Sequence, residues 1–235
     1  MREHGVPTWH DVANLNEEPT EEELRRLLRQ PETSSAVLWL TPEVEQSLLI
    51  RQVEAPEIVR RARRKDGFFV VPVVAGGLDY ADVSRILDAA HLFEDLTTWN
   101  LRRVSSDPIG YGEAAEVARC VLSRRLAKIH AYLDQEQPLH VGLYARAADI
   151  RARDEALRMD WTQHFDGRVA TGDAWTSRLL PALGAVRAAL GQIPDRKIIA
   201  GGRPSLSAAL AFGRTFVQPA GFSLSWEQSG LGGDT

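Results

Sequence analysis

Cysteine and long apolar runs are both scarce in this chain. Cys120 is the only cysteine among 235 residues, so no internal disulfide can form. The chain also does not open with a basic and then apolar leader, and we therefore expect a cytoplasmic protein rather than a secreted one. Arginine, aspartate or glutamate interrupts every apolar run before the roughly 20 residues that a membrane helix needs, so no membrane span is predicted. Cys120 lies in a helical pattern and is interpreted as a small buried residue.

An excess of positive charge is lacking as well. The net charge is −4, with 13 basic and 18 acidic residues in residues 1–105 and 15 basic and 14 acidic residues in residues 106–235. A protein that binds duplex DNA usually carries a strong positive excess, so we expect no duplex nucleic acid partner for either half. With 44% apolar residues, the chain is long enough for two small domains, each with its own core.

The most recognisable catalytic motifs are missing. There is no Gly-x-x-x-x-Gly-Lys-Ser/Thr loop, no Gly-x-Ser-x-Gly turn, no His-Glu-x-x-His and no Cys-x-x-Cys, so the corresponding enzyme classes lose support. His164 and Asp166 are residue types that bind metals. A lone pair of this kind is far more often part of a solvated loop, and no metal site is predicted.

The first half of the chain has the pattern of an α/β domain. Residues 36–40 and 68–74 are apolar without polar alternation, which predicts strands buried on both faces of a parallel sheet. A helix is predicted after Thr20, where Thr20 to Glu23 has the form of a capping box. Further helices are predicted over residues 48–64, starting or bending near Pro56, and over residues 79–90.

The second half repeats this alternation after a cluster of turn-forming residues at 105–110. This cluster predicts a domain boundary that separates residues 1–105 from residues 106–235. Helical spacing of apolar residues predicts helices, and apolar or alternating runs predict strands. The expected elements are a long helix over 115–133, a strand at 139–144, a helix over 175–190, a strand at 197–200, a helix over 206–212 and a half-buried strand at 222–226.

Three stretches of the first half resemble the later part of a bacterial TIR domain, which has a flavodoxin-like parallel sheet. They are Gly5-Val6-Pro7-Thr8-Trp9-His10-Asp11-Val12, then Ala36-Val37-Leu38-Trp39-Leu40-Thr41-Pro42, then Ser47-Leu48-Leu49-Ile50-Arg51-Gln52-Val53-Glu54. The resemblance implies that residues 6–9 form the second strand of that fold and residues 36–40 the third. It also implies that the TIR-like domain is incomplete, because the family's first strand would precede Met1.

The TIR resemblance implies that Glu54 is the catalytic residue of an NAD-cleaving enzyme, with NAD as the substrate and no cofactor. A carboxylate can stabilise the positive charge that develops on the ribose when the nicotinamide–ribose bond breaks. Ser47 and Trp9 are the expected substrate-binding residues. For Ser47, capping of the helix is an equal alternative. For Glu54, the alternative is a solvated surface group, which is what a glutamate near a helix start usually is by composition alone.

Two stretches of the second half resemble the SAVED domain, which is similar to the Rossmann-like CARF sensors and binds cyclic oligonucleotides. They are Leu179-Leu180-Pro181-Ala182-Leu183 and the run from Gly201-Gly202-Arg203-Pro204-Ser205 to Gly213. Residues 106–235 would be the first half of such a domain. Backbone N–H groups before a helix can bind phosphate, so Arg203, Ser205 and Ser207 are the expected ligand-binding residues. A plain turn is the alternative.

Together, the two halves resemble a TIR–SAVED effector of the CBASS antiphage class. This resemblance implies an NAD-hydrolysing antiviral defence protein that is activated when a cyclic oligonucleotide binds and the chains stack by self-association. The alternative is a non-catalytic nucleotide-binding or interaction module, or an inactive fragment of such an effector. Because the first TIR strand and the second sensor half would be missing, we expect little or no NAD cleavage by this chain alone.

Overall fold

The computed structural model describes residues 1–8, 20–88, 101–105, 108–132, 137–146, 155–193, 197–218 and 221–227. It is an α/β protein that divides into two compact units. The amino-terminal unit comprises Trp9–Val121, and the carboxy-terminal unit comprises Met1–Thr8 together with Leu122–Thr235. The division falls inside helix α6 (Tyr111–Tyr132), downstream of the boundary predicted at residues 105–106. The first eight residues therefore group with the second half of the chain.

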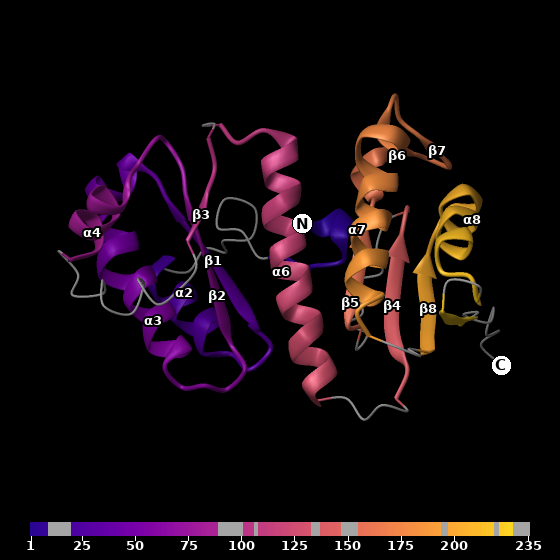
Figure 1. Ribbon diagram of the computed structural model, residues 1–235, viewed down its shortest axis with the longest axis horizontal. Helices are drawn as coiled ribbons and strands as arrows, with labels where there is room; N and C mark the ends of the chain where they lie inside the picture. The colour runs from indigo at the N-terminus through magenta and orange to yellow at the C-terminus, as the bar shows by residue number, and fades with distance from the viewer. Residues whose placement is uncertain are drawn as a thin grey trace. The chain divides into compact units, whose positions relative to one another are not determined.

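The amino-terminal unit contains a parallel sheet with the strand order β1-β2-β3, whose strands are labelled in Figure 1. The strands are β1 (Ser35–Leu40), β2 (Phe69–Val74) and β3 (Arg102–Arg103). The prediction of parallel, apolar strands at 36–40 and 68–74 is confirmed, because β1 and β2 pair in parallel and β2 is buried from residue 70 onward. Among the described residues, β1 pairs on one side only and its first half is partly exposed.

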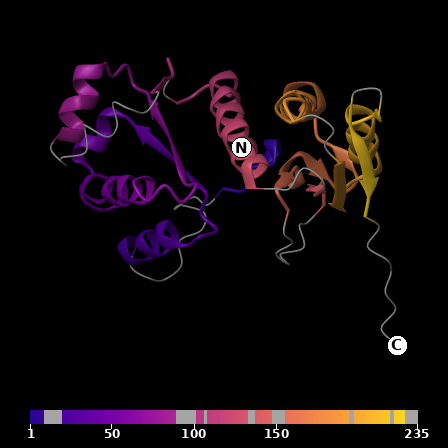
Figure 2. The same ribbon diagram turned by 60° about the horizontal axis from the view of Figure 1, so that its bottom comes forward.

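Helices of this unit pack on the sheet through an apolar core. They are α2 (Thr20–Arg29), α3 (Ala55–Ala62) and α4 (Tyr80–Asp88), and α2 packs beside α3 (Figure 2). Leu38, Ile58 and Ile86 bring strand and helices together in this core. Each such side chain contributes roughly 1.5–3 kcal/mol by leaving water.

The helix predicted over residues 48–64 forms, and Pro56 explains its shape. It begins at Leu48, widens into a π turn, η3 (Ile50–Glu54), and continues as α3. Proline lacks an N–H and its ring crowds the carbonyl four residues earlier, so a widened turn just before it relieves both problems. A second example occurs in the other unit, where the π turn η5 (Trp175–Leu179) precedes Pro181 in α7 (Leu180–Leu190).

The strand predicted over residues 6–9 is wrong for the part that the structure describes. Arg2–His4 form a short 3-10 turn, η1, which ends at Gly5 with a left-handed φ of 80°. His4, Gly5 and Val6 are buried, and the Gly5 carbonyl accepts a hydrogen bond from the Arg158 N–H at 2.9 Å. The local pattern is strand-like, but packing against a segment more than a hundred residues away decides the conformation.

The carboxy-terminal unit has a four-stranded, fully parallel sheet with the order β5-β4-β8-β9. Its strands are β4 (Leu139–Tyr144), β5 (Leu157–Asp160), β8 (Lys197–Arg203) and β9 (Ser223–Trp226), and α8 (Leu206–Thr215) joins β8 to β9. Helix α7 packs against α8 (Figures 1 and 2). The predicted strands β4, β8 and β9 and the predicted helices α7 and α8 all form, although β9 is mostly exposed rather than half-buried.

Three short elements follow β5 and were not predicted. They are the 3-10 turn η4 (Thr162–His164) and a hairpin of two antiparallel strands, β6 (Phe165–Asp166) and β7 (Val169–Ala170). In Figure 1 the hairpin lies at the end of the unit toward which the arrows of β4 and β8 point. No helix within the described residues is both long and apolar enough to cross a bilayer.

Candidate functional site

The strand order of the carboxy-terminal unit marks one place on its sheet as a candidate ligand site. The chain leaves β4 toward β5 on one side and later returns to build β8 and β9 on the other side. The connections therefore diverge between β4 and β8. In open parallel sheets, ligands bind outside the carboxyl ends of the two strands that flank such a switch point.

The loops that follow β4 and β8 are joined at this edge. The N–H groups of Ala145 and Arg146 donate to the carbonyl oxygen of Arg203 at 3.1 and 3.3 Å. The Arg146 guanidinium also donates to the carbonyl of Pro204 at 3.4 Å. The side chains of Arg146 and Arg203 are both exposed, so two permanent positive charges lie on neighbouring loops.

Gly202 permits the close approach of β8 to β4. Its φ is 107°, and a Cβ there would lie 2.5 Å from the carbonyl oxygen and 2.9 Å from the nitrogen of Leu143. Only glycine fits both restrictions. The second glycine of the Gly-Gly-Arg-Pro-Ser motif is therefore required by the packing of β8 against β4.

Ser205 and Ser207 lie together at the first turn of α8. The Ser205 hydroxyl accepts a hydrogen bond from the Ala208 N–H at 3.2 Å, so Ser205 is the N-cap of the helix. The hydroxyls of Ser205 and Ser207 are 3.0 Å apart, and Ser207 is exposed whereas Ser205 is only 4% exposed. The structure thus brings Arg203, at the end of β8, and Ser205 and Ser207, at the start of α8, into one short stretch, with Ser207 and Arg203 exposed.

Arg146 is a residue of this site that sequence reasoning missed. Its signal was present, because it follows the predicted strand 139–144 at the carboxyl edge of a parallel sheet. Which strand would lie beside it was not visible, since the register between Tyr144 and Arg203 joins segments about 60 residues apart.

Glu54 occupies the last position of η3 and its side chain is half-buried. Its neighbours Val53 and Ala55 are buried in the core. The helical segment that carries it follows β1 and the 3-10 turn η2 (Pro42–Gln46), so Glu54 lies on the connection that leaves the carboxyl end of β1.

Ser47 caps the same segment. Its hydroxyl accepts a hydrogen bond from the Ile50 N–H at 3.3 Å, which is the capping alternative to substrate binding. Ser47 and Glu54 are separated by two helical turns, about 10 Å along the axis, so they would contact different parts of one substrate. Trp9, the other expected substrate-binding residue, lies outside the described residues.

Glu57 is a buried carboxylate that the sequence did not single out. It is 3% exposed and accepts hydrogen bonds from Arg60 at 2.6 Å, from Arg29 at 3.2 Å and from Arg25. Burial alone would raise the pKa of Glu57, but the hydrogen bonds and charges of these three arginines outweigh it and lower the pKa. Glu57 therefore stays ionised and holds α2 against α3, which makes it a structural residue rather than a proton donor.

His164 and Asp166 do not come together as a metal site. The imidazole Nε2 of His164 lies 3.0 Å from the carboxylate of Glu3, and Asp166 belongs to the β6–β7 hairpin. Within the part of the chain that the structure describes, no group of three or more potential ligands could hold a metal ion.

A comparison with protein-family models and a comparison with curated proteins both found no match for this chain.

Proposed function

We propose that the carboxy-terminal unit binds a phosphate-bearing nucleotide at the carboxyl ends of β4 and β8. The observation that carries this proposal is the switch point in the order β5-β4-β8-β9, at which two loops are hydrogen-bonded to one another. The SAVED resemblance suggests the ligand class, a cyclic oligonucleotide.

The chemistry of the edge favours an anionic ligand. Arg146 and Arg203 present guanidinium groups there, and guanidinium binds phosphate with two parallel hydrogen bonds. The first turn of α8 adds the N–H groups and partial positive charge of a helix N-terminus. Ser207 adds an exposed hydroxyl that can donate to a phosphate oxygen.

The binding proposal is tested by titrating the chain with cyclic di-AMP, cyclic di-GMP and cyclic tri-AMP. At least one ligand should bind, and Arg203→Ala should weaken it roughly 10- to 100-fold, the equivalent of one charge-assisted hydrogen bond. Arg214→Ala is the matched control, because Arg214 is exposed in the last turn of the same helix. If neither Arg203→Ala nor Arg214→Ala changes the affinity, the ligand binds elsewhere.

For the amino-terminal unit we propose the TIR-like activity, in which Glu54 cleaves the nicotinamide–ribose bond of NAD. Its support is the half-buried position of Glu54 on the connection after β1. The chain as a whole would then be a cyclic oligonucleotide-dependent, NAD-hydrolysing antiphage effector that self-associates when the ligand is bound.

A binding module without turnover is the second candidate, and two observations favour it. Among the described strands, the order β1-β2-β3 contains no switch point, so no topological crevice lies beside Glu54. Ser47 is already engaged as a helix cap. The candidates separate in an NAD-consumption assay in the presence of a ligand that binds, since only the enzyme consumes NAD.

A further inference from the structure

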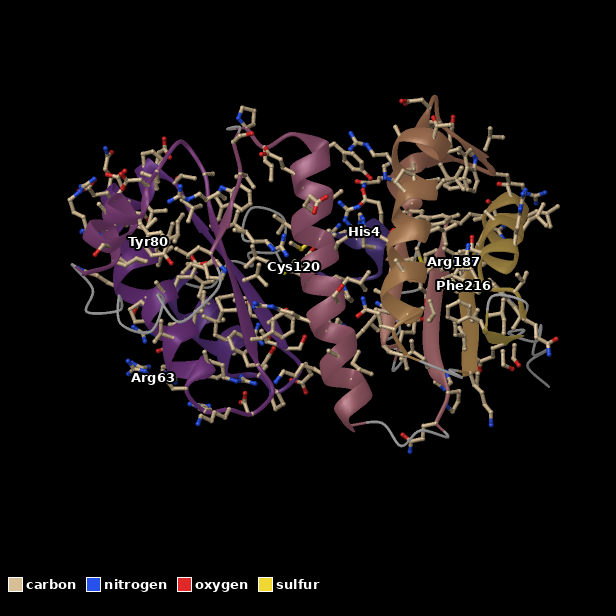
Figure 3. The ribbon with its side chains drawn as sticks, in the orientation of Figure 1. His4, Arg63, Tyr80, Cys120, Arg187 and Phe216 are labelled. Atoms are coloured by element: carbon tan, nitrogen blue, oxygen red, sulfur yellow. The ribbon has the colours of Figure 1, made fainter. Side chains whose placement is uncertain are left out.

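The first residues of the chain form part of the carboxy-terminal unit, although the chain continues from Thr8 directly into the amino-terminal unit. Turn η1 packs against β5 and α7. Figure 3 labels His4 on this segment, and its side chain is only 2% exposed. The segment is therefore held by specific contacts within the carboxy-terminal unit.

Glu3 makes three polar contacts that help to hold the segment. Its backbone carbonyl accepts the indole N–H of Trp161 at 3.1 Å, and its carboxylate accepts the Gln163 amide at 2.9 Å. The same carboxylate lies 3.0 Å from the imidazole of His164. Gly5 then lies so close to β5 that an added Cβ would be 3.0 Å from the Cβ of Leu157.

The three partners of Glu3 lie within residues 161–164, immediately after the carboxyl end of β5. This short segment also carries the β6–β7 hairpin. The His164 carbonyl accepts the Thr171 N–H at 2.9 Å, and the rings of Trp161 and Phe165 both pack edge-on against Trp175. Residues 161–164 therefore join the first residues of the chain to a hairpin at the sheet edge where ligands are proposed to bind.

The hairpin carries exposed side chains that suit a nucleotide ligand. Its turn has Gly167 with a φ of 58° at the first central position, as a tight two-residue turn requires, and exposed Arg168 at the second. Val169 is 71% exposed. An exposed guanidinium and an exposed apolar side chain are thus carried on an arm at the same end of the sheet as the proposed ligand site (Figure 1).

We infer that Met1–His4 act as a coupling latch, whose contacts with Trp161, Gln163 and His164 transmit ligand occupancy at the carboxyl edge along the chain into the amino-terminal unit. This inference rests on the proposed function for its ligand. A shift of the hairpin moves residues 161–164, changes their hydrogen bonds to Glu3 and so changes how firmly the first residues are held. The two states would differ in the docking of this segment, which gives the coupling a physical element that both ends influence.

The experiment uses the full chain with Glu3→Ala, which removes the carboxylate contacts and keeps the backbone bond to Trp161. The control is Arg2→Gln, because Arg2 contacts Thr8 within the same segment. Hydrogen exchange is measured first without ligand. The amides of residues 161–171 should exchange at least tenfold faster in Glu3→Ala and at the wild-type rate in Arg2→Gln. Unchanged exchange in Glu3→Ala would overturn the latch, whatever the chain binds.

Binding and the hydrogen exchange of the described amides of the amino-terminal unit are then measured with the cyclic oligonucleotides named above. In the wild type the ligand should change exchange in that unit, whereas Glu3→Ala should keep its affinity within about threefold of wild type and lose this change. An equal ligand-dependent change in wild type and Glu3→Ala would overturn the coupling while leaving the proposed function intact. A wild-type chain that binds none of the ligands would instead overturn the proposed function and, with it, the signalling role of the latch.

Discussion

Gly202→Ala should destabilise the carboxy-terminal unit strongly, because two separate restrictions act at this position. A non-glycine residue in a left-handed conformation costs on the order of 1–3 kcal/mol. The added methyl would lie 2.5 Å from the carbonyl oxygen of Leu143, and relieving such overpacking costs roughly another 1–3 kcal/mol. We therefore expect a loss of about 2–6 kcal/mol in the free energy of unfolding.

The assay should report on this unit alone. Hydrogen exchange of the β4 and β8 amides under increasing denaturant meets this requirement. The matched control is Gly213→Ala in α8, where an added Cβ meets nothing within 4 Å. The same change should there stabilise the helix by up to about 1 kcal/mol. If Gly202→Ala is as stable as the wild type, the close approach of β8 to β4 at this edge has been misread.

Three further changes test the remaining residues. Glu54→Gln should abolish any NAD consumption that the protein shows. The control is Glu43→Gln, which changes an exposed glutamate on η2 and should keep the activity. Equal turnover in both variants would remove Glu54 from the catalytic role. Glu57→Ala should destabilise the amino-terminal unit by roughly 2 kcal/mol in urea unfolding. This is less than the loss of a fully buried ion pair would cost, because the arginine partners of Glu57 are partly exposed. An unchanged unfolding midpoint would contradict this expectation. Burial would raise the pKa of Glu3, but hydrogen bonds from a backbone N–H and His164 and the charge of the amino terminus lower this pKa from 4.5 to about 2. The ionised Glu3 carboxylate therefore contributes fully to stability above pH 4.5, and this contribution is lost as the pH falls toward 2. After correction for the intrinsic pH dependence of amide exchange, protection at residues 161–171 should fall over that window in the wild type and not in Glu3→Ala.

The strands that sequence could predict are those made mostly of apolar residues. Residues 69–74 are apolar throughout and residues 139–144 are apolar except for the exposed His140, and both segments form central strands of parallel sheets. Strand β5 was missed because Leu157 and Met159 alternate with Arg158 and Asp160 over only four residues. So short an alternation does not stand out from a loop.

The conformation of residues 6–8 could not be predicted for a different reason. Val6-Pro7-Thr8 has strand-like composition, but the segment docks beside β5, and contacts across that sequence separation leave no local signal. Glu57 was missed because a glutamate on a helix is ordinarily solvated. Its burial depends on arginines of α2, which only the packing of the two helices brings together.

The candidate ligand loop was partly predictable from its motif. Gly201-Gly202-Arg203-Pro204-Ser205 before a helical pattern placed Arg203, Ser205 and Ser207 at a helix start, and the structure has them there. The switch point was not predictable. It depends on β5 lying on the opposite side of β4 from β8, and β5 itself was not foreseen.

The most direct test of the central claim is to locate the bound ligand by hydrogen exchange with a cyclic oligonucleotide at saturating concentration. We predict slower exchange at Ala145, Arg146 and the first turn of α8, where the loops after β4 and β8 meet. Protection confined to any other edge, or no protection at these residues despite binding, would contradict the assignment of the ligand site to the β4–β8 switch point.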